Sequence, residues 1–336
     1  MTRPCYRIGV LGAGSWGTAL AMLLAGNGHA VQLWTHRPAR AEEMSQAREN
    51  SAYLPGLPFP ESLEISADLG SVLAHAEILL LVVPSHVFRQ TLIAIKPFLQ
   101  TQHKLAWATK GLEPDSRKLL HQQVKEELGE MLATAVVSGP TFAREVAQKL
   151  PGAVTVASRD SAFAAQLADA LHTDYFRAYI GRDVVGVEIG GAVKNVLAIA
   201  AGAADGLGFG ANARAALIAR GLAEVTRLGV ALGAQTETFT GLTGLGDLVL
   251  TCTDNQSRNR RLGLAVGQGK DIQQAMKDIG QVVEGFNTAR EVHALAQSLG
   301  VDMPITEQIY RVLHEGLSPH DAVQALMERA IRAEHD

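Results

Sequence analysis

The sequence predicts an α/β fold: an N-terminal Rossmann-type domain with a mostly parallel sheet, then a second, all-helical C-terminal domain. A buried strand runs directly into a glycine-rich turn at 6–17. Strand-like and helix-like runs then alternate to about residue 180, as the crossover helices of a parallel sheet require. After Gly181, Ala-, Leu- and Val-rich helical runs replace the strands. We therefore expect domains at 1–181 and 182–336.

The first element is the apolar run Tyr6–Leu11, which is followed by Gly12, Ala13, Gly14, Ser15, Trp16 and Gly17. Good helix formers occupy 18–25, so this GxGxxG motif lies between a strand and a helix, as a dinucleotide-binding turn does. In such a turn the first glycine permits the bend, the second admits a pyrophosphate and the third lets the helix pack on the strand. A nucleoside triphosphate loop needs Lys where Thr18 stands and is excluded. A tight turn without a ligand is the alternative.

A second strand is predicted at 30–35, and its end should meet the adenosine ribose. An NAD-selective site places Asp or Glu there, whereas this chain has His36 and Arg37. A guanidinium can bind a 2′-phosphate through paired hydrogen bonds, which a carboxylate would repel. The sequence therefore predicts that NADPH is preferred or at least accepted. The alternative is that Arg37 and Arg40 only solvate a loop.

The same alternation predicts the remaining elements of this domain. Strands are expected at 78–83, 104–108, 134–138, 153–157 and 176–179, and helices at 92–99, 117–131, 142–148 and 161–172. The prolines at 55, 58 and 60 predict a loop. Ligands bind beyond the carboxyl ends of such strands, where Lys110 could meet a substrate oxygen near the nicotinamide. For His86, at another strand end, loop packing explains the residue better than catalysis.

The run 184–204 predicts a helix that is apolar all round, with Glu188 and Lys194 as its only charged side chains. Its charges and low hydrophobicity argue against membrane insertion, so we interpret it as a helix buried in protein. Residues three and four away from Lys194 are apolar or small, so no acid on this helix pairs with it. A buried ammonium is costly, so the fold must supply a distant carboxylate or a cleft, or the lysine must lose its proton easily.

A lysine that loses its proton easily suits the general base of an alcohol oxidation, which takes the hydroxyl proton as hydride leaves carbon. Lys194 is therefore the candidate catalytic residue. The alternative is a lysine that extends to solvent and does no chemistry. The neighbouring Asn195 could bond a hydroxyl, the nicotinamide amide or only a backbone group.

The run 241–247 is too rich in glycine for a helix interior and predicts a turn, with Asp247 at or near a helix start. Asp247 either caps that helix or faces Lys194 and tunes its pKa. The segment 253–262 predicts a basic loop that could clamp a phosphate or simply be solvated; its arginines are Arg258, Arg260 and Arg261. The run 282–285 predicts a loop whose role the pattern leaves open.

Composition limits the class of protein. The chain is 47% hydrophobic and 19% charged, as globular proteins are, and its net charge of −4 gives no sign of a nucleic-acid partner. Cys5 and Cys252 lie far apart without metal-ligand spacing, so we expect no metal site and a reduced, cytoplasmic setting. The first residues do not have the pattern of a secretory signal.

Taken together, these motifs resemble the bacterial-type NAD(P)-dependent sn-glycerol-3-phosphate dehydrogenases. The matching runs occur in the family's order over most of the chain: 12–19, 33–37, 108–113, 138–143, 189–195, 243–247 and 257–259. The glycine motif is shared with many dehydrogenases, whereas the set with Lys110, Lys194 and 257–259 is specific. Thr141 stands where many relatives have Ser, a change that keeps the hydroxyl.

The resemblance implies reversible hydride transfer between NADP(H), or NAD(H), and dihydroxyacetone phosphate, making sn-glycerol 3-phosphate for phospholipid synthesis. It implies that Lys194 donates and accepts the proton and that the protein is a homodimer. The implied substrate residues are Lys110, Gly139, Thr141, Lys194, Asp247, Ser257, Arg258 and Asn259. The implied cofactor residues, beside the three glycines, are Ser15, Trp16, His36, Arg37, Lys110, Ala143, Arg258, Val282 and Glu284.

Two other functions stay open from the sequence. The same fold could reduce another small carbonyl compound. Replacing dihydroxyacetone phosphate with unphosphorylated dihydroxyacetone would distinguish the two functions, since a phosphate clamp should make dihydroxyacetone a very poor substrate. A cofactor-binding sensor without turnover would bind NADPH even after Lys194→Ala and would not oxidise it with any small ketone phosphate.

Overall fold

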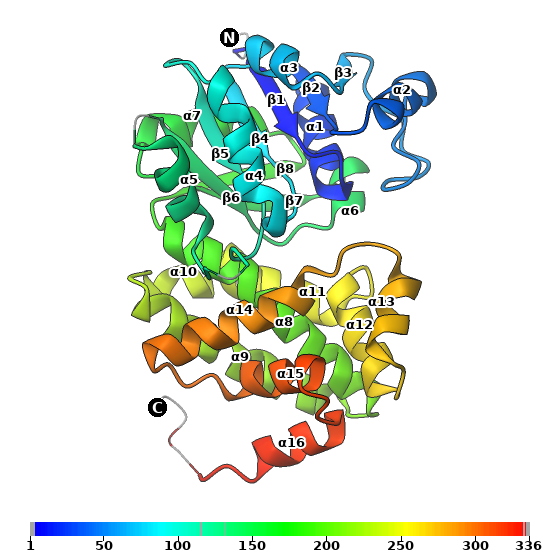
Figure 1. Ribbon diagram of the computed structural model, residues 1–336, viewed down its shortest axis with the longest axis vertical. Coiled ribbons are helices and arrows are strands. Elements are labelled where there is room, and N and C mark those ends of the chain that lie inside the picture. The colour runs from blue at the N-terminus through cyan, green and yellow to red at the C-terminus, as the bar shows by residue number, and fades with distance from the viewer. Residues whose placement is uncertain (1–3, 115, 131, 332, 334–336) are drawn as a thin grey trace.

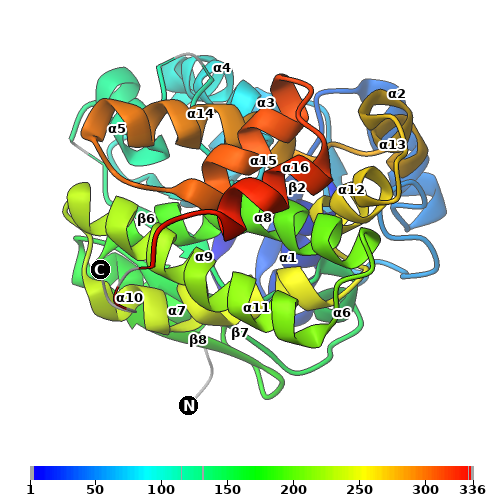
Figure 2. The same cartoon turned by 90° about the horizontal axis from the view of Figure 1, so that it is seen from below.

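The computed structural model describes residues 4–114, 116–130, 132–331 and 333. It consists of two lobes, an α/β lobe that contains the N-terminus and a helical lobe that contains the C-terminal part of the chain (Figure 1). Seen from below, the helices of the second lobe are arranged around the central α8 (Figure 2). The predicted fold class is therefore confirmed.

The described part of the chain forms one eight-stranded sheet in the order β3-β2-β1-β4-β5-β6-β7-β8. Its first six strands have the order of a dinucleotide-binding fold. Neighbours are parallel except for the antiparallel pair β6 and β7. The strands are β1 (Arg7–Leu11), β2 (Ala30–Trp34), β3 (Leu63–Ser66), β4 (Ile78–Leu81), β5 (Lys104–Trp107), β6 (Thr134–Ser138), β7 (Gly152–Ala157) and β8 (Phe176–Gly181).

Helices cover both faces of this sheet, because successive side chains of a strand point to opposite faces. Ile8 and Leu80 belong to a core with α1, α6 and α7, whereas Leu79 and Trp107 belong to a core with α3, α4 and α5. The helices of this lobe are α1 (Ser15–Gly26), α2 (Pro38–Ala47), α3 (Leu69–His75), α4 (Ser85–Ile95), η1 (Lys96–Phe98), α5 (Leu120–Leu128), α6 (Ala143–Ala147) and α7 (Ser161–Leu171).

From Val184 onward, every element in the described part is helical. The elements are α8 (Val184–Gly206), α9 (Ala211–Ala231), α10 (Thr236–Thr240), η2 (Leu242–Gly246), α11 (Asp247–Thr253), α12 (Arg258–Gly267), α13 (Ile272–Ile279), α14 (Glu284–Leu299), α15 (Pro304–His314) and α16 (Pro319–Met327).

Several predicted boundaries in the first lobe are wrong. The helix predicted at 92–99 begins seven residues earlier, at Ser85, because Pro84 has the fixed φ that suits a helix start. The helix predicted at 117–131 is shorter, because Gly129 ends it with a φ of 75°; its predicted last residue lies outside the described residues. The α2–β3–α3 segment carries no strong periodicity and was not predicted.

Three predictions in the second lobe also need correction. The 241–247 turn is a π-helical turn, η2, that continues into α11, and Gly244 is required there because a Cβ would lie 2.0 Å from the Phe239 oxygen. The 253–262 segment is a loop only as far as Ser257, whose hydroxyl caps α12 by accepting a hydrogen bond from the Arg260 N–H (3.2 Å). The 282–285 segment is a loop only as far as Val283, since α14 begins at Glu284.

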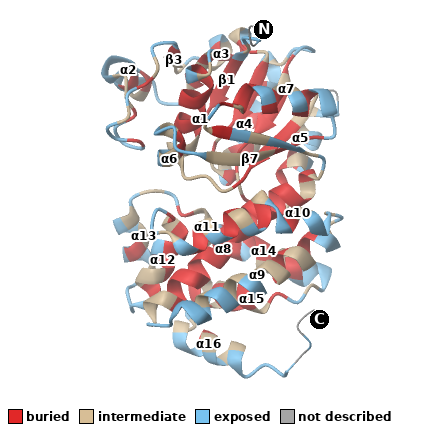
Figure 3. Cartoon of the chain, turned by 180° about the vertical axis from the view of Figure 1, so that it is seen from behind, coloured by how far each residue is buried: buried red, intermediate tan, exposed pale blue. Residues whose placement is uncertain are grey.

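α8 is the centre of the helical lobe and is almost wholly buried (Figure 3). Among the described helices it is long and apolar enough to cross a membrane, but 94% of its most apolar window is buried within the protein. α8 and α12 approach closely because glycines face each other's backbone. A Cβ on Gly202 would lie 2.1 Å from the Arg260 oxygen, and one on Gly263 would lie 2.0 Å from the Ile199 oxygen.

We predict that Gly202→Ala lowers the free energy of unfolding by at least about 1–3 kcal/mol, because the new methyl group meets rigid backbone and α12 must move away. Urea unfolding followed by circular dichroism measures the change. Gly26→Ala is the matched control, since a Cβ there meets nothing within 4 Å. Equal stability of Gly202→Ala and the control would contradict the prediction.

Candidate active site

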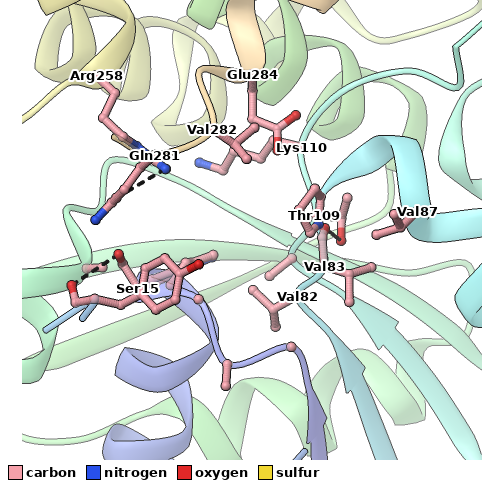
Figure 4. A pocket seen from close by; sticks show the side chains of 18 of the residues that line it. Ser15, Val82, Val83, Val87, Thr109, Lys110, Arg258, Gln281, Val282 and Glu284 are labelled. Atoms are coloured by element: carbon pink, nitrogen blue, oxygen red, sulfur yellow. Dashed lines mark hydrogen bonds between the residues drawn. The ribbon is translucent and has the colours of Figure 1, made fainter. Parts of the chain in front are cut away.

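A cleft of about 920 Å³ lies between the two lobes and is lined from both. The α/β lobe contributes the glycine turn, the end of β2 and the ends of β4, β5 and β6; the helical lobe contributes α8, α11, α12 and the start of α14. Figure 4 shows Ser15 and Lys110 of the first lobe and Arg258 and Glu284 of the second lobe around the same space.

The glycine turn forms one wall of the cleft. Gly12 has a φ of 118°, and a Cβ on Gly17 would lie 1.9 Å from the Gly12 oxygen, so both positions require glycine. A Cβ on Gly14 would meet nothing within 4 Å, which leaves the approach to the backbone open. α1 begins here without a side-chain cap, so its first N–H groups are available to an anion. This arrangement fits the pyrophosphate of a dinucleotide.

The end of β2 forms the outer part of the cleft. His36 and Arg37 line it, and Arg37 Nε donates to His36 Nε2 (3.2 Å), which holds the two polar side chains together. Arg40 lies over the Tyr53 ring (5.1 Å) and donates to Asn50 Oδ1 (2.7 Å). Two guanidinium groups therefore line the cleft at the end of β2.

A carboxylate between two lysines is the chemical centre of the cleft. Asp247, fully buried at the start of α11, accepts from Lys194 Nζ of α8 through Oδ1. Through Oδ2 it accepts from Lys110 Nζ (2.7 Å), beyond the end of β5. Lys194 Nζ also donates to Thr251 Oγ1 (3.0 Å), and Lys110 Nζ lies 3.4 Å from the Gly139 oxygen. The two ammonium groups, one from each lobe, thus share one acid.

Burial and this charge pattern set the protonation of Lys194. Burial lowers its pKa to about 7; Asp247 opposes this shift, and the positive charge of Lys110 adds to it. A group with such a pKa is present in both forms near neutral pH, so it can give or take a proton. Perturbed pKa values of this kind cluster at functional sites.

A hydrogen-bonded row connects α8, α12 and α14 beside the lysines. Asn259 Nδ2 donates to Asn195 Oδ1 (2.9 Å), and Asn259 Oδ1 accepts from the Gly285 N–H (2.9 Å). A Cβ on Gly285 would lie 2.7 Å from both the Asn195 oxygen and Asn259 Oδ1, so glycine is required there. The asparagines therefore fix the start of α12, and with it Arg258, relative to Lys194.

Arg258 and Glu284 face the cleft from the helical lobe (Figure 4). Arg258 NH1 donates to Gln281 Oε1 (3.4 Å). Burial raises the pKa of Glu284 to about 7, against the opposing effects of Arg258 and of the Ser85 hydroxyl, which donates to Glu284 Oε2 (3.3 Å). Ser85 belongs to α4, so this hydrogen bond also crosses between the lobes.

Most of the predicted site residues line the cleft: Gly12, Gly14, Ser15, Trp16, His36, Arg37, Lys110, Thr141, Ala143, Lys194, Ser257, Arg258, Asn259, Val282 and Glu284. Gly17, Gly139 and Asp247 are not part of its wall. Gly17 packs on Gly12, Gly139 offers its oxygen to Lys110, and Asp247 lies behind both lysines. These three act on the site through their neighbours.

The predicted clamp of three arginines is wrong for Arg260. This side chain points to Asp205 and donates through Nε to the Cys252 oxygen (3.0 Å), so it joins α8, α11 and α12. Arg258 and Arg261 do line the cleft. Arg260 points elsewhere because 258–261 is helical, so successive side chains point in directions about 100° apart.

The cleft is also lined by Tyr53, Thr251 and Gln281, which were not among the predicted site residues. Thr251 had a usable signal, because it lies one helical turn after Asp247 and so shares its face. Tyr53 and Gln281 lie in loops, where no helix or strand periodicity predicts which way a side chain points. Among the described residues, no group of three His, Cys, Asp or Glu side chains is placed to hold a metal ion.

Comparison with known proteins identifies the relatives of this chain. The family models of the N-terminus and C-terminus of NAD-dependent glycerol-3-phosphate dehydrogenase match residues 7–164 and 183–324. A glycerol-3-phosphate dehydrogenase [NAD(P)+] of Aeromonas hydrophila is 58% identical over 96% of this chain and 97% of its own length. The crystal structure of the Coxiella burnetii glycerol-3-phosphate dehydrogenase has a TM-score of 0.94 and is 50% identical over 97% of this chain and 99% of that chain.

We predict that Asp247→Asn lowers the pKa of Lys194 by about 1–3 units from its value near 7, because the charge that holds its proton is lost. The measurement is an NMR titration of ¹³C-dimethylated lysines, with Lys194→Arg to assign the resonance. Thr251→Val removes only a neutral acceptor and should shift the pKa much less. If the pKa of Lys194 fell no further in Asp247→Asn than in Thr251→Val, or if it rose, the role given to this carboxylate would be contradicted.

Proposed function

Since this chain belongs to the NAD-dependent glycerol-3-phosphate dehydrogenase family, we propose that it interconverts dihydroxyacetone phosphate and sn-glycerol 3-phosphate with NADP(H) or NAD(H). The observation that carries the proposal is the inter-lobe pair of lysines, Lys110 and Lys194, on one buried acid at the edge of a dinucleotide-binding cleft. The bound nicotinamide supplies or accepts the hydride. The residues of this chain supply the proton and hold the substrate.

Lys194 is the proton donor and acceptor in this proposal. In the direction of ketone reduction, its ammonium form gives a proton to the oxygen that becomes the hydroxyl group. In the direction of alcohol oxidation, the neutral amine takes that proton back. Its pKa of about 7 supports both directions near neutral pH. Lys110, which donates to Asp247 from the other lobe, binds the carbonyl oxygen in this proposal.

The start of α12 binds the substrate phosphate in this proposal. Arg258 offers paired donors, and the Ser257 and Asn259 side chains lie on either side of it at a helix N-terminus. Thr141 lines the cleft from the other lobe, and its hydroxyl donates to the Gly139 oxygen (3.3 Å). A phosphate held here places the three-carbon chain toward Lys194, which lines the same cleft.

The nucleotide would lie along 12–17, with its adenosine end near His36 and Arg37 and its nicotinamide end near Lys110, Ala143, Val282 and Glu284. Residues 1–181 then form the cofactor domain and 182–336 the substrate domain. We further propose a cytoplasmic homodimer that supplies glycerol 3-phosphate for phospholipid synthesis. The family membership supports this setting.

The deciding experiment follows NADPH absorbance with dihydroxyacetone phosphate. We expect Lys194→Ala to lower kcat by about 10²–10⁴-fold, the usual contribution of a general acid, with NADPH affinity unchanged. Dihydroxyacetone should be a very poor substrate of the wild type. Arg258→Ala should reduce the difference in kcat/KM between dihydroxyacetone phosphate and dihydroxyacetone. Wild-type kcat in Lys194→Ala, or equal use of both compounds, would contradict the assignment.

Cofactor choice is tested at the end of β2. We expect Arg37→Asp to raise the KM for NADPH at least about tenfold more than the KM for NADH, because a carboxylate repels the 2′-phosphate. Initial rates with each cofactor give the ratio. Arg177→Asp, on the exposed face of β8, is the control for the change of surface charge. An unchanged ratio would show that Arg37 only solvates the loop.

A further inference from the structure

Glu188 is a buried carboxylate that the proposed chemistry does not use. It lies on α8, and its side chain is only 1% exposed. Its Oε1 accepts from the indole Nε1 of Trp107 (3.0 Å) and from the backbone N–H of His121 (2.9 Å). Its Oε2 lies 2.6 Å from His121 Nδ1. All three donors belong to the α/β lobe, so this carboxylate joins the two lobes.

The groups around this carboxylate suit a hydrogen-bond acceptor. The Trp107 indole and the His121 backbone N–H can only donate, and His121 Nδ1 donates in the tautomer that carries its proton there. His121 lies in the first turn of α5, where the helix dipole favours negative charge, and its backbone N–H bonds to Glu188. Hydrogen bonds require a defined distance and angle, so these three contacts fix α8 to β5 and α5.

The contact also links the two lysine-bearing elements. Trp107 is the last residue of β5, three residues before Lys110, and Glu188 lies six residues before Lys194 on α8. Val184 and Val187 of the same helix pack in one core with Trp107.

Between Glu188 and Lys194, α8 lies against the side chain of Lys110. A Cβ on Gly191 would lie 3.6 Å from Lys110 Cγ and 2.9 Å from Ser138 Oγ, so the lysine stem lies along the helix at a point where there is no side chain. Glu188 and Lys194 point in directions about 120° apart around α8. Fixing both side chains therefore fixes the rotation of the helix as well as its position along its axis.

We propose that Glu188 is a positioning residue, which holds α8 on Trp107 and His121 so that Lys194 and Lys110 meet the same carboxylate of Asp247. The inference rests on the proposed function, since it gives the reaction its aligned pair of lysines. Without the Glu188 contact, the apolar packing of Val184 and Val187 still holds α8 near Trp107, but such packing has no preferred direction. Lys194 then spends less time against Asp247.

The test compares Glu188→Gln and Trp107→Phe with wild type by the ¹³C-dimethyl-lysine titration of Lys194 and by steady-state kinetics. Loss of contact with Asp247 removes the charge that holds the Lys194 proton, so the titration midpoint should move to lower pH in both variants. kcat should fall roughly 10- to 100-fold, the usual effect of a small misplacement of reacting groups. NADPH affinity and the KM for dihydroxyacetone phosphate should change little.

Glu224→Gln is the matched control. Glu224 of α9 is also buried and also accepts three hydrogen bonds, from the Ile305 N–H (2.6 Å), the Thr306 N–H (3.1 Å) and the Thr306 hydroxyl (2.9 Å). These bonds join α9 only to the start of α15, within the helical lobe. The control should lose thermal stability as Glu188→Gln does but keep the wild-type Lys194 midpoint and kcat.

A wild-type midpoint in folded Glu188→Gln and Trp107→Phe, or an equal shift in Glu224→Gln, would overturn the positioning role. The titration decides this without turnover. Absence of NADPH oxidation by the wild-type protein with dihydroxyacetone phosphate would instead overturn the proposed function, so the two failures are distinguishable.

Discussion

The arrangement of the cleft depends on one buried carboxylate. Asp247 is fully inaccessible to solvent and neutralises two ammonium groups that come from different lobes. Without it, Lys110 and Lys194 would repel each other in a desolvated site, and neither could remain buried at low cost. With it, both lysines have an acceptor, and the pKa of Lys194 is about 7. The same ion pairs hold the cleft together and prepare its chemistry.

The backbone around Asp247 is closely packed, because glycines of the helical lobe let neighbouring elements approach each other. Gly190 lies against the Thr243 oxygen, where a Cβ would be only 2.5 Å away, so α8 can approach the π-helical turn that leads into Asp247. The close α8–α12 contact sets the start of α12 beside Lys194 in the same way. Glycine within a helix lowers the stability of that helix, and here the close backbone approach that glycine permits offsets the loss.

Several contacts join the lobes around the cleft. Asp247 holds Lys110, Ser85 donates to Glu284, and Glu188 holds Trp107 and His121. They all use charged or polar side chains that are buried or half-buried. Polar contacts are directional, so they specify one relative placement of the lobes, whereas apolar packing alone would permit several.

The sequence by itself determined the α/β order, the glycine turn after β1 and a buried lysine on α8 that needed a distant carboxylate, a cleft or an easily lost proton. These features follow from local chemistry, because periodicity reports which residues are buried and glycine reports where backbone must come close. Tertiary structure decided which groups meet. Lys194 and Asp247 are 53 residues apart, and Lys110 and Asp247 are 137 apart. Likewise, only the helical start at Arg258 sends Arg260 to Asp205 rather than into the cleft. Partners at such separations depend on how helices cross and which face each presents, and no local pattern encodes that.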